Sequence, residues 1–156
     1  MTFEYTSRYV WILMLIAVLG MTPLSYAESS NDKTSIEDVK KQTHDFLQVL
    51  KSYTADQRDE AILKTKAALD DLDKRIDALE KHIDDNWDKM DKAARENARA
   101  SLDALRKRRT QVAEWYGSLK NSSVDAWGHM KKGFSDAYKS LYDAWEKSEK
   151  EFGSDG

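Results

Sequence analysis

Apolar residues recur at helical spacing through the middle of the chain and form two long stripes. The first stripe steps mainly by three, four or seven residues, which keeps it on one side of a helix: Ile62, Leu69, Leu72, Ile76, Leu79, Ile83 and Met90. The second stripe consists of Ala94, Ala98, Ser101, Leu102, Leu105, Val112, Trp115 and Leu119. Neither helix could bury its stripe alone in water. The pattern therefore predicts a long antiparallel helical hairpin, similar to a coiled coil, over residues 54–121 with its turn near Met90.

A shorter stripe precedes the hairpin. It consists of Ile36, Val39, Thr43, Phe46, Leu50 and Tyr53, at alternating steps of three and four. Ser35 can cap this helix, because its hydroxyl can accept a hydrogen bond from an amide of the first turn. Glu37 and Asp38 suit the positive end of the helix dipole in that turn. The sequence thus predicts an N-terminal helix over residues 35–53.

Polar residues indicate where the later helices begin. Thr54 is followed three residues later by Gln57, and Ser122 is followed three residues later by Asp125, which is the spacing of a capping box. Asp91 can cap the returning arm of the hairpin. We expect a new helix after each position. One continuous helix through Met90 remains an alternative, since neither Gly nor Pro marks the turn.

Charged residues predict a register for the hairpin. If its turn centres on residues 89–90, acidic residues of the first arm face basic residues of the second: Asp70, Asp71 and Asp73 face Arg106, Lys107, Arg108 and Arg109. Exposed ion pairs contribute only ~0–1 kcal/mol each, so they would select the register rather than stabilise the fold. The alternative is that the basic residues form a solvated helix face.

After the second stripe the repeat length changes to eleven residues. Four apolar residues have this spacing: Leu119, Met130, Leu141 and Phe152. Eleven residues complete three turns at about 3.67 residues per turn, which favours a straight or slightly right-handed helix. The sequence therefore predicts a C-terminal amphipathic helix over residues 122–152, followed by a tail over residues 153–156.

The C-terminal helix carries our candidate interaction surface, which consists of Trp127, Met130, Phe134, Tyr138, Leu141, Trp145 and Phe152. An aromatic stripe at helical spacing usually packs on protein. Here it could pack on Phe46, Leu50 and Tyr53, on a protein partner, or on a second copy of the chain in a homodimer. Flanking lysines are also typical of a helix in peripheral contact with a membrane. Interspersed acidic residues weaken attraction to anionic lipid.

Residues 1–27 have the three parts of a signal peptide: a short polar start, an apolar run over residues 10–19, and small residues before the cleavage site. We predict export to the periplasm with cleavage after Ala27, and a disordered polar linker over residues 28–34. The alternative is an uncleaved inner-membrane anchor over residues 9–24. Its apolar run is shorter than the roughly 20 residues that a spanning helix needs.

Composition narrows the classes of function. The chain has 156 residues, 34% of them charged, with a net charge of -3. Charge of mixed sign does not favour nucleic-acid binding. The lack of cysteine excludes disulfides, thiol catalysis and cysteine-ligated metals. No nucleophile elbow or glycine-rich phosphate loop is present. We therefore expect no enzyme, no cofactor and no small-molecule substrate.

One pair of residues keeps a metal-dependent enzyme as a remote alternative. His82 and Asp85 lie one helical turn apart, so both could ligate a metal ion. Ala78 occupies the preceding turn and supplies no third ligand. The pattern is unspecific, and a solvated pair on a charged helix is the simpler interpretation.

Residues 53–61, 113–120 and 127–152 resemble small exported helical coiled-coil proteins of Gram-negative bacteria, which are associated with stress responses. The resemblance implies a periplasmic helical protein linked to envelope stress, and it supplies no catalytic or ligand residues. The eleven-residue repeat is similar to helices of apolipoproteins and late-embryogenesis-abundant proteins. That similarity implies an alternative role on membrane surfaces or as a protectant. We expect a non-enzymatic interaction protein that binds a protein partner or itself.

Overall fold

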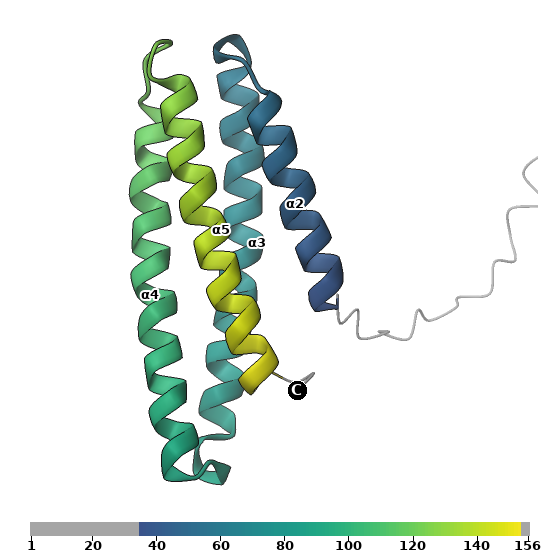
Figure 1. The fold of residues 1–156 in the computed structure, drawn as a ribbon, viewed down its shortest axis with the longest axis vertical. Helices are drawn as coiled ribbons and strands as arrows, with labels where there is room; N and C mark the ends of the chain where they lie inside the picture. Colours follow the sequence, from purple (N-terminus) through teal and green to yellow (C-terminus); the bar gives the residue numbers. More distant parts are fainter. Residues whose placement is uncertain (1–34, 154–156) are drawn as a thin grey trace, which may run out of the picture. The chain divides into compact units, whose positions relative to one another are not determined.

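Four α-helices make up most of residues 35–153, which are the residues that the computed structural model describes. They are α2 (Ile36–Ser52), α3 (Arg58–Asp85), α4 (Lys92–Lys120) and α5 (Trp127–Phe152), with short 3-10 turns at Ala55–Gln57 and Trp87–Lys89 (Figure 1). No strand occurs among these residues, so the all-α prediction is confirmed. The predicted signal peptide, linker and anchor lie outside the described residues, as do residues 154–156.

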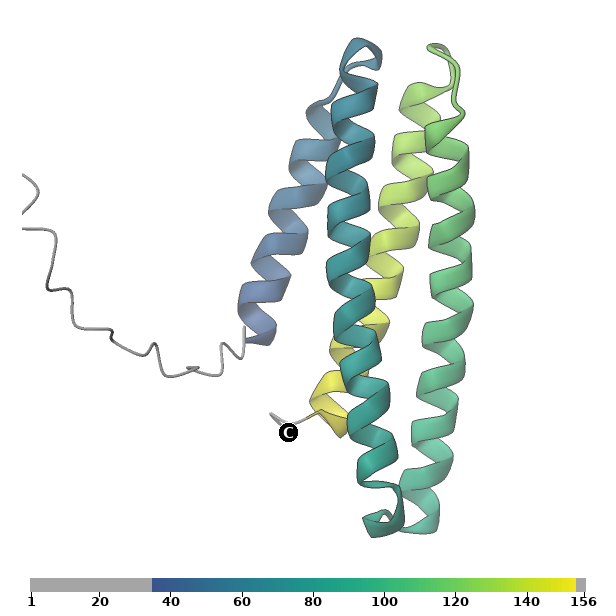
Figure 2. The ribbon, with the colours of Figure 1, turned by 180° about the vertical axis from the view of Figure 1, so that it is seen from behind.

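Each helix runs antiparallel to the one before it. The turns that join α2 to α3 and α4 to α5 lie at one end of the bundle, and the turn between α3 and α4 lies at the other (Figures 1 and 2). Helices α3 and α5 are therefore parallel to each other, with α2 and α4 on opposite sides of them. Because α5 packs on all three other helices, it is the central element of the bundle.

Hydrogen bonds at the helix starts confirm three of the predicted caps. Ser35 and Asp38 form a capping box in which the Asp38 amide donates to the Ser35 hydroxyl at 3.2 Å. The Thr54 amide donates to the side-chain oxygen of Gln57 at 3.1 Å. The Asp91 carboxylate accepts from an amide of the first turn of α4 at 2.8 Å. The hairpin turns between α3 and α4, which also confirms the predicted break near Met90.

The predicted start of the C-terminal helix is wrong by five residues, because α5 begins at Trp127 rather than at Ser122. The Ser122 hydroxyl donates to the carbonyl of Leu119 at 2.9 Å, so it closes α4 instead of capping α5. The Ser122 carbonyl in turn accepts from the guanidinium of Arg58 at 2.5 Å. Residues 122–126 therefore connect the helices, and their polar groups tie the connection to the start of α3.

The two long stripes converge on the core as predicted. Their buried members are Leu72, Ile76, Leu79 and Ile83 from α3 and Ala98, Leu102, Leu105, Val112 and Leu119 from α4. Ala61 and Thr65 are also fully buried, although the spacing of large apolar residues did not include them. Helix α5 contributes more buried residues than any other helix. The hairpin therefore encloses its core together with α5 rather than alone.

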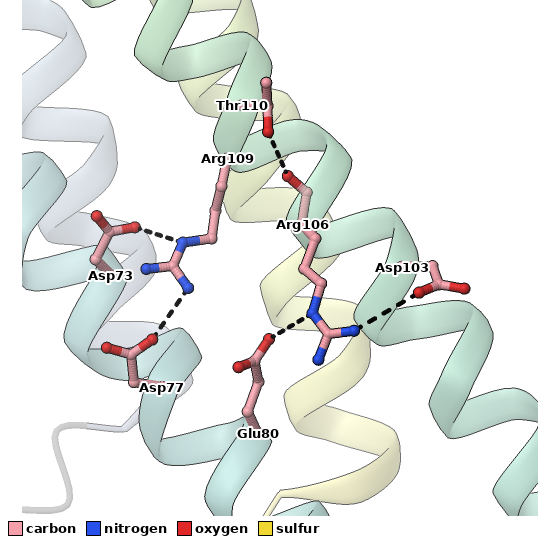
Figure 3. A network of polar contacts seen from close by, with 7 residues as sticks. All are labelled: Asp73, Asp77, Glu80, Asp103, Arg106, Arg109 and Thr110. Atoms are coloured by element: carbon pink, nitrogen blue, oxygen red, sulfur yellow. Dashed lines mark hydrogen bonds and ion pairs between the residues drawn. The ribbon is translucent and has the colours of Figure 1, made fainter.

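Ion pairs join the two arms of the hairpin (Figure 3). The Arg109 guanidinium lies 3.0 Å from the carboxylate of Asp73 and 3.0 Å from that of Asp77. The Arg106 guanidinium lies 3.5 Å from the carboxylate of Glu80. Desolvation opposes the charge of Arg109, but the two aspartates outweigh it and raise the pKa of its guanidinium. Acid thus meets base across the arms, as the sequence predicted.

Of the three predicted aspartates only Asp73 meets the basic residues of α4, and it pairs with Arg109 rather than with Arg106 at its own level. Asp70 pairs with Lys66 and Asp71 pairs with Arg75, in both cases within α3. The reason is that side chains on a helix lean toward its N-terminus. On antiparallel arms the facing side chains therefore lean in opposite directions. The arginines of α4 consequently reach carboxylates nearer the turn than the residues at their own level.

Candidate interaction surface

The structure places six of the seven candidate surface residues in the bundle core. Trp127, Phe134, Tyr138, Leu141, Trp145 and Phe152 each expose 9% or less of their area, and Met130 is partly buried. Their side chains face the other helices of the same chain. In this fold they are therefore core residues rather than an exposed surface.

The aromatic side of α5 packs on α2, so among the alternatives that the sequence left open the structure shows the one within the same chain. The ring of Phe46 meets the rings of Phe134 and Tyr138 edge to face, with centroids 6.4 Å and 5.1 Å apart. The indole nitrogen of Trp127 donates to the carbonyl of Tyr53 at 3.1 Å. Edge-to-face pairs and a satisfied indole N–H are typical of a specific core contact.

Burial changes the acidity of two phenols on α5. The hydroxyl of Tyr138 donates to the carbonyl of Ala68 in α3 at 3.3 Å, and burial raises the pKa of Tyr138 to about 12. Burial also raises the pKa of Tyr142, and the nearby carboxylate of Glu146 raises it further. Both phenols are therefore neutral at physiological pH and serve packing rather than proton transfer.

A charged contact fixes the end of α2 against α5. The ammonium of Lys131 donates to the carbonyls of Lys51 and Tyr53 at 2.9 Å and 2.6 Å. A cation at this position also suits the negative end of the α2 dipole. Desolvation lowers the pKa of Lys131, but no acidic partner is involved in that shift. The lysine therefore acts as a C-terminal cap for α2.

An open groove of about 550 Å³ runs between α4 and α5 on the outside of the bundle. Small side chains line it: Ala100, Ser101 and Ala104 from α4, and Ser140, Ala144 and Ser148 from α5. Longer polar residues complete the lining: Asn97, Arg108, Asp143, Lys147 and Glu151. Because six of the eleven lining side chains are Ala or Ser, another helix could approach α4 and α5 closely here.

Close packing of α4 on α5 extends beyond the groove. A Cβ atom at Gly133 of α5 would overlap the ring of Trp115 of α4, so this position needs the smallest side chain. The same ring lies 6.1 Å from the imidazole of His129. Further along, Arg108 donates a hydrogen bond to the hydroxyl of Ser140. These contacts align α4 and α5 antiparallel, with Ala104 at the level of Ala144.

Three charged residues of α5 line the groove at steps of four: Asp143, Lys147 and Glu151. Lys139 and Asp143 form an ion pair at 2.7 Å within the helix. Among the described residues, Lys147 and Glu151 have no ion-pair partner. The α4 side of the groove is uncharged at Asn97, Ala100, Ser101 and Ala104 and ends at Arg108. The groove therefore combines an uncharged small-residue row with a row of alternating charge.

Sequence reasoning missed this groove because it followed large apolar residues. The available signals were the uncharged row on an otherwise charged α4 and the alternating signs from Lys139 to Glu151. Both signals lie on the helix faces opposite the apolar stripes. They become meaningful only once α4 and α5 are known to be neighbours.

The metal and membrane alternatives concern other parts of the molecule. His82 lies beside Asn86 in the structure, with 3.4 Å between their side-chain nitrogens. No cluster of three or more metal-ligating side chains occurs within residues 35–153. Over the same residues, none of the helices combines the length and the apolar character needed to cross a bilayer.

Comparisons with known proteins identify no relative of the chain. No protein-family model matches it, and neither a curated protein nor a solved structure is significantly similar to it. Its function therefore has to be inferred from its own residues and fold.

Proposed function

We propose that this chain is a non-enzymatic helical interaction protein of the periplasm, linked to envelope stress, that binds a protein partner or a second copy of itself. The observation that carries the proposal is the open groove between α4 and α5. Its lining residues are mostly Ala and Ser, which lose little conformational entropy when they are covered. A partner helix could therefore approach the groove closely at small entropic cost.

The proposal favours a protein partner over a lipid surface for an energetic reason. Lipid binding by α5 would use its aromatic side, and those side chains are buried in the bundle. Exposing them would cost about 1.5–3 kcal/mol for each large apolar side chain. The exposed side of α5 carries charges of both signs, which gives little attraction to anionic lipid. The fold as it stands therefore suits protein contacts better.

Site-specific photocrosslinking tests the proposal. A photoreactive amino acid at Ala104 in the groove should crosslink to a discrete protein, or to another copy of the chain, in intact cells. The matched control places the same amino acid at Lys64, an exposed residue of α3. Equal crosslinking from both positions, or none from Ala104, would contradict the proposal.

Vesicle flotation tests the membrane alternative. Co-flotation with anionic vesicles and a blue shift of tryptophan emission would support a lipid-binding role instead. The non-enzymatic part of the proposal rests on the sequence, and sustained turnover by the purified protein in hydrolase or transferase screens would contradict it.

A further inference from the structure

We infer that the α4–α5 face binds the same face of a second copy of the chain, so that the two copies form a symmetric antiparallel dimer. The inference rests on the proposed function and identifies the partner of its groove. The face is defined by the small residues of the groove together with the charged residues of α5 that line it, which are Asp143, Lys147 and Glu151. Three features of this face support a second copy as the occupant.

The first feature is that the charges on α5 complement themselves. Their signs alternate at steps of four, so they lie along one side of the helix. Consider a two-fold axis that runs perpendicular to α5 and crosses it midway between Asp143 and Lys147. This axis brings Asp143 of one copy opposite Lys147 of the second copy. The same contact occurs twice by symmetry, so the two charges beside the axis each meet an opposite charge.

The second feature is that α4 offers a close contact at the same level. The hydrogen bond from Arg108 to Ser140 fixes how far α4 and α5 are shifted along each other, and Ala104 and Ala144 line one groove. The axis that crosses α5 between Asp143 and Lys147 therefore crosses α4 between Ala100 and Ala104. Ala100 then faces Ala104 of the second copy. Small uncharged side chains on both sides let the two α4 helices approach closely where the axis crosses them.

The third feature is that the other two-fold arrangement is unfavourable. An axis parallel to the helices would bring the charged row of α5 opposite the uncharged row of α4. Lys147 and Glu151, which have no ion-pair partner among the described residues, would then be covered without one. Burying unpaired charge is costly. The antiparallel arrangement avoids this cost at Lys147, which it places opposite Asp143 of the second copy.

Charge reversal tests the inference with the full chain, recovered from cells as they process it. Lys147→Glu brings like charges together at both symmetric contacts, and so does Asp143→Lys. Each single variant should weaken dimerisation at least tenfold, measured by sedimentation over a concentration series. Mixing the two single variants should restore the dimer, because each then supplies the charge that the other lacks. The double variant should also dimerise.

Two controls separate this result from unfolding and from general charge effects. Circular dichroism should show that each single variant remains helical, and the recovered dimer in the mixture would prove that both retain the face. Lys64→Glu makes the same charge change on an exposed position of α3 and should leave dimerisation unchanged. Dimers that withstand both single reversals would overturn the inference.

A cysteine introduced near the proposed axis tests the geometry independently. The chain has no cysteine of its own, so Ala104→Cys creates a single thiol. In the antiparallel dimer it should form a disulfide-linked dimer readily, whereas Lys64→Cys should not. A wild-type chain that stays monomeric up to about 1 mM would overturn the inference, since this corresponds to a binding free energy weaker than about -4 kcal/mol. That result would leave the proposed function intact if Ala104 still crosslinked to another protein.

Discussion

Helix α4 contacts its two neighbours by different means. Toward α3, which precedes it in sequence, long arginines bridge the gap to carboxylates (Figure 3). Toward α5, small residues and Gly133 allow close packing, and Trp115 covers the glycine. A groove of about 400 Å³ at the edge between α3 and α4 reaches down to Leu141 of α5, which is itself buried.

The comparison shows that two consecutive helix pairs in one bundle can pack differently, since α4 packs more closely on α5 than on α3. Ion pairs at the α3–α4 edge act over long side chains, so they tolerate separation of the helices. Close contact at the α4–α5 edge depends on the absence of side-chain atoms. The stability of the α3–α4 edge should therefore depend on the buried side chains beneath it. The stability of the α4–α5 edge should depend on any side-chain atoms that are added there.

The largest effect should come from Leu141→Ala, which removes the side chain beneath the α3–α4 edge. Leu141 is 1% exposed, and truncation of a buried leucine costs about 2–5 kcal/mol of unfolding free energy. Urea denaturation measures this loss. Leu63→Ala, at a position that is 69% exposed, serves as the control and should change stability by less than about 0.5 kcal/mol. Similar losses from both variants would contradict the role of Leu141.

Alkaline pH tests the contact between α3 and α5. The unfolded chain ionises its tyrosines near pH 10, whereas burial holds Tyr138 neutral up to about pH 12. The stabilisation is therefore fully present below pH 10 and is lost as the pH rises toward 12. The loss should approach about 2–3 kcal/mol. Tyr138→Phe should lose less stability than the wild type over this range, and parallel curves for the two would refute the assignment.

Added bulk at the α4–α5 edge should destabilise the fold. Gly133→Ala forces its new Cβ atom against the ring of Trp115, which should cost about 1–3 kcal/mol despite the better helix propensity of alanine. Gly128→Ala meets nothing within 4 Å and should instead stabilise α5 by up to about 1 kcal/mol. Thermal unfolding of the two variants should therefore shift in opposite directions. Stabilisation by both would show that Trp115 moves aside freely.

The smallest effect should come from the ion pairs of the α3–α4 edge. Arg109→Gln removes the contacts to Asp73 and Asp77, which are partly exposed, so the loss should be about 0–1 kcal/mol and smaller at high salt. Lys107→Gln, at an exposed position of the same helix, should change stability less. A loss as large as that of Leu141→Ala would mean that ion pairs hold this edge together.

The sequence predicted the elements of the fold because their signals are local. Capping at Ser35 and Asp91 involves residues within one turn, and each stripe repeats along a single helix. Even the contact of Phe46 with α5 followed from pairing the aromatic stripe with the nearest available apolar face. Local rules failed at Ser122, because its hydroxyl could bond either at the end of α4 or at the start of α5, and in the structure it bonds at the end of α4.

The arrangement of the helices was harder to predict because it depends on distant residues. The α4–α5 contact requires Gly133 to meet Trp115, and neither residue alone indicates the other. The burial of Trp145 and Phe152 likewise depends on three helices converging on α5. A sequence pattern shows that a stripe must be covered, but it does not show which helix covers it.

The central place of α5 has a consequence for how the protein is made. Because α5 follows α2, α3 and α4 along the chain, the ribosome completes it after the helices that need it. Until residues 127–152 emerge, the apolar faces of the earlier helices lack their common partner. The nascent chain should therefore stay unfolded through most of its synthesis and fold only once its last helix has left the ribosome.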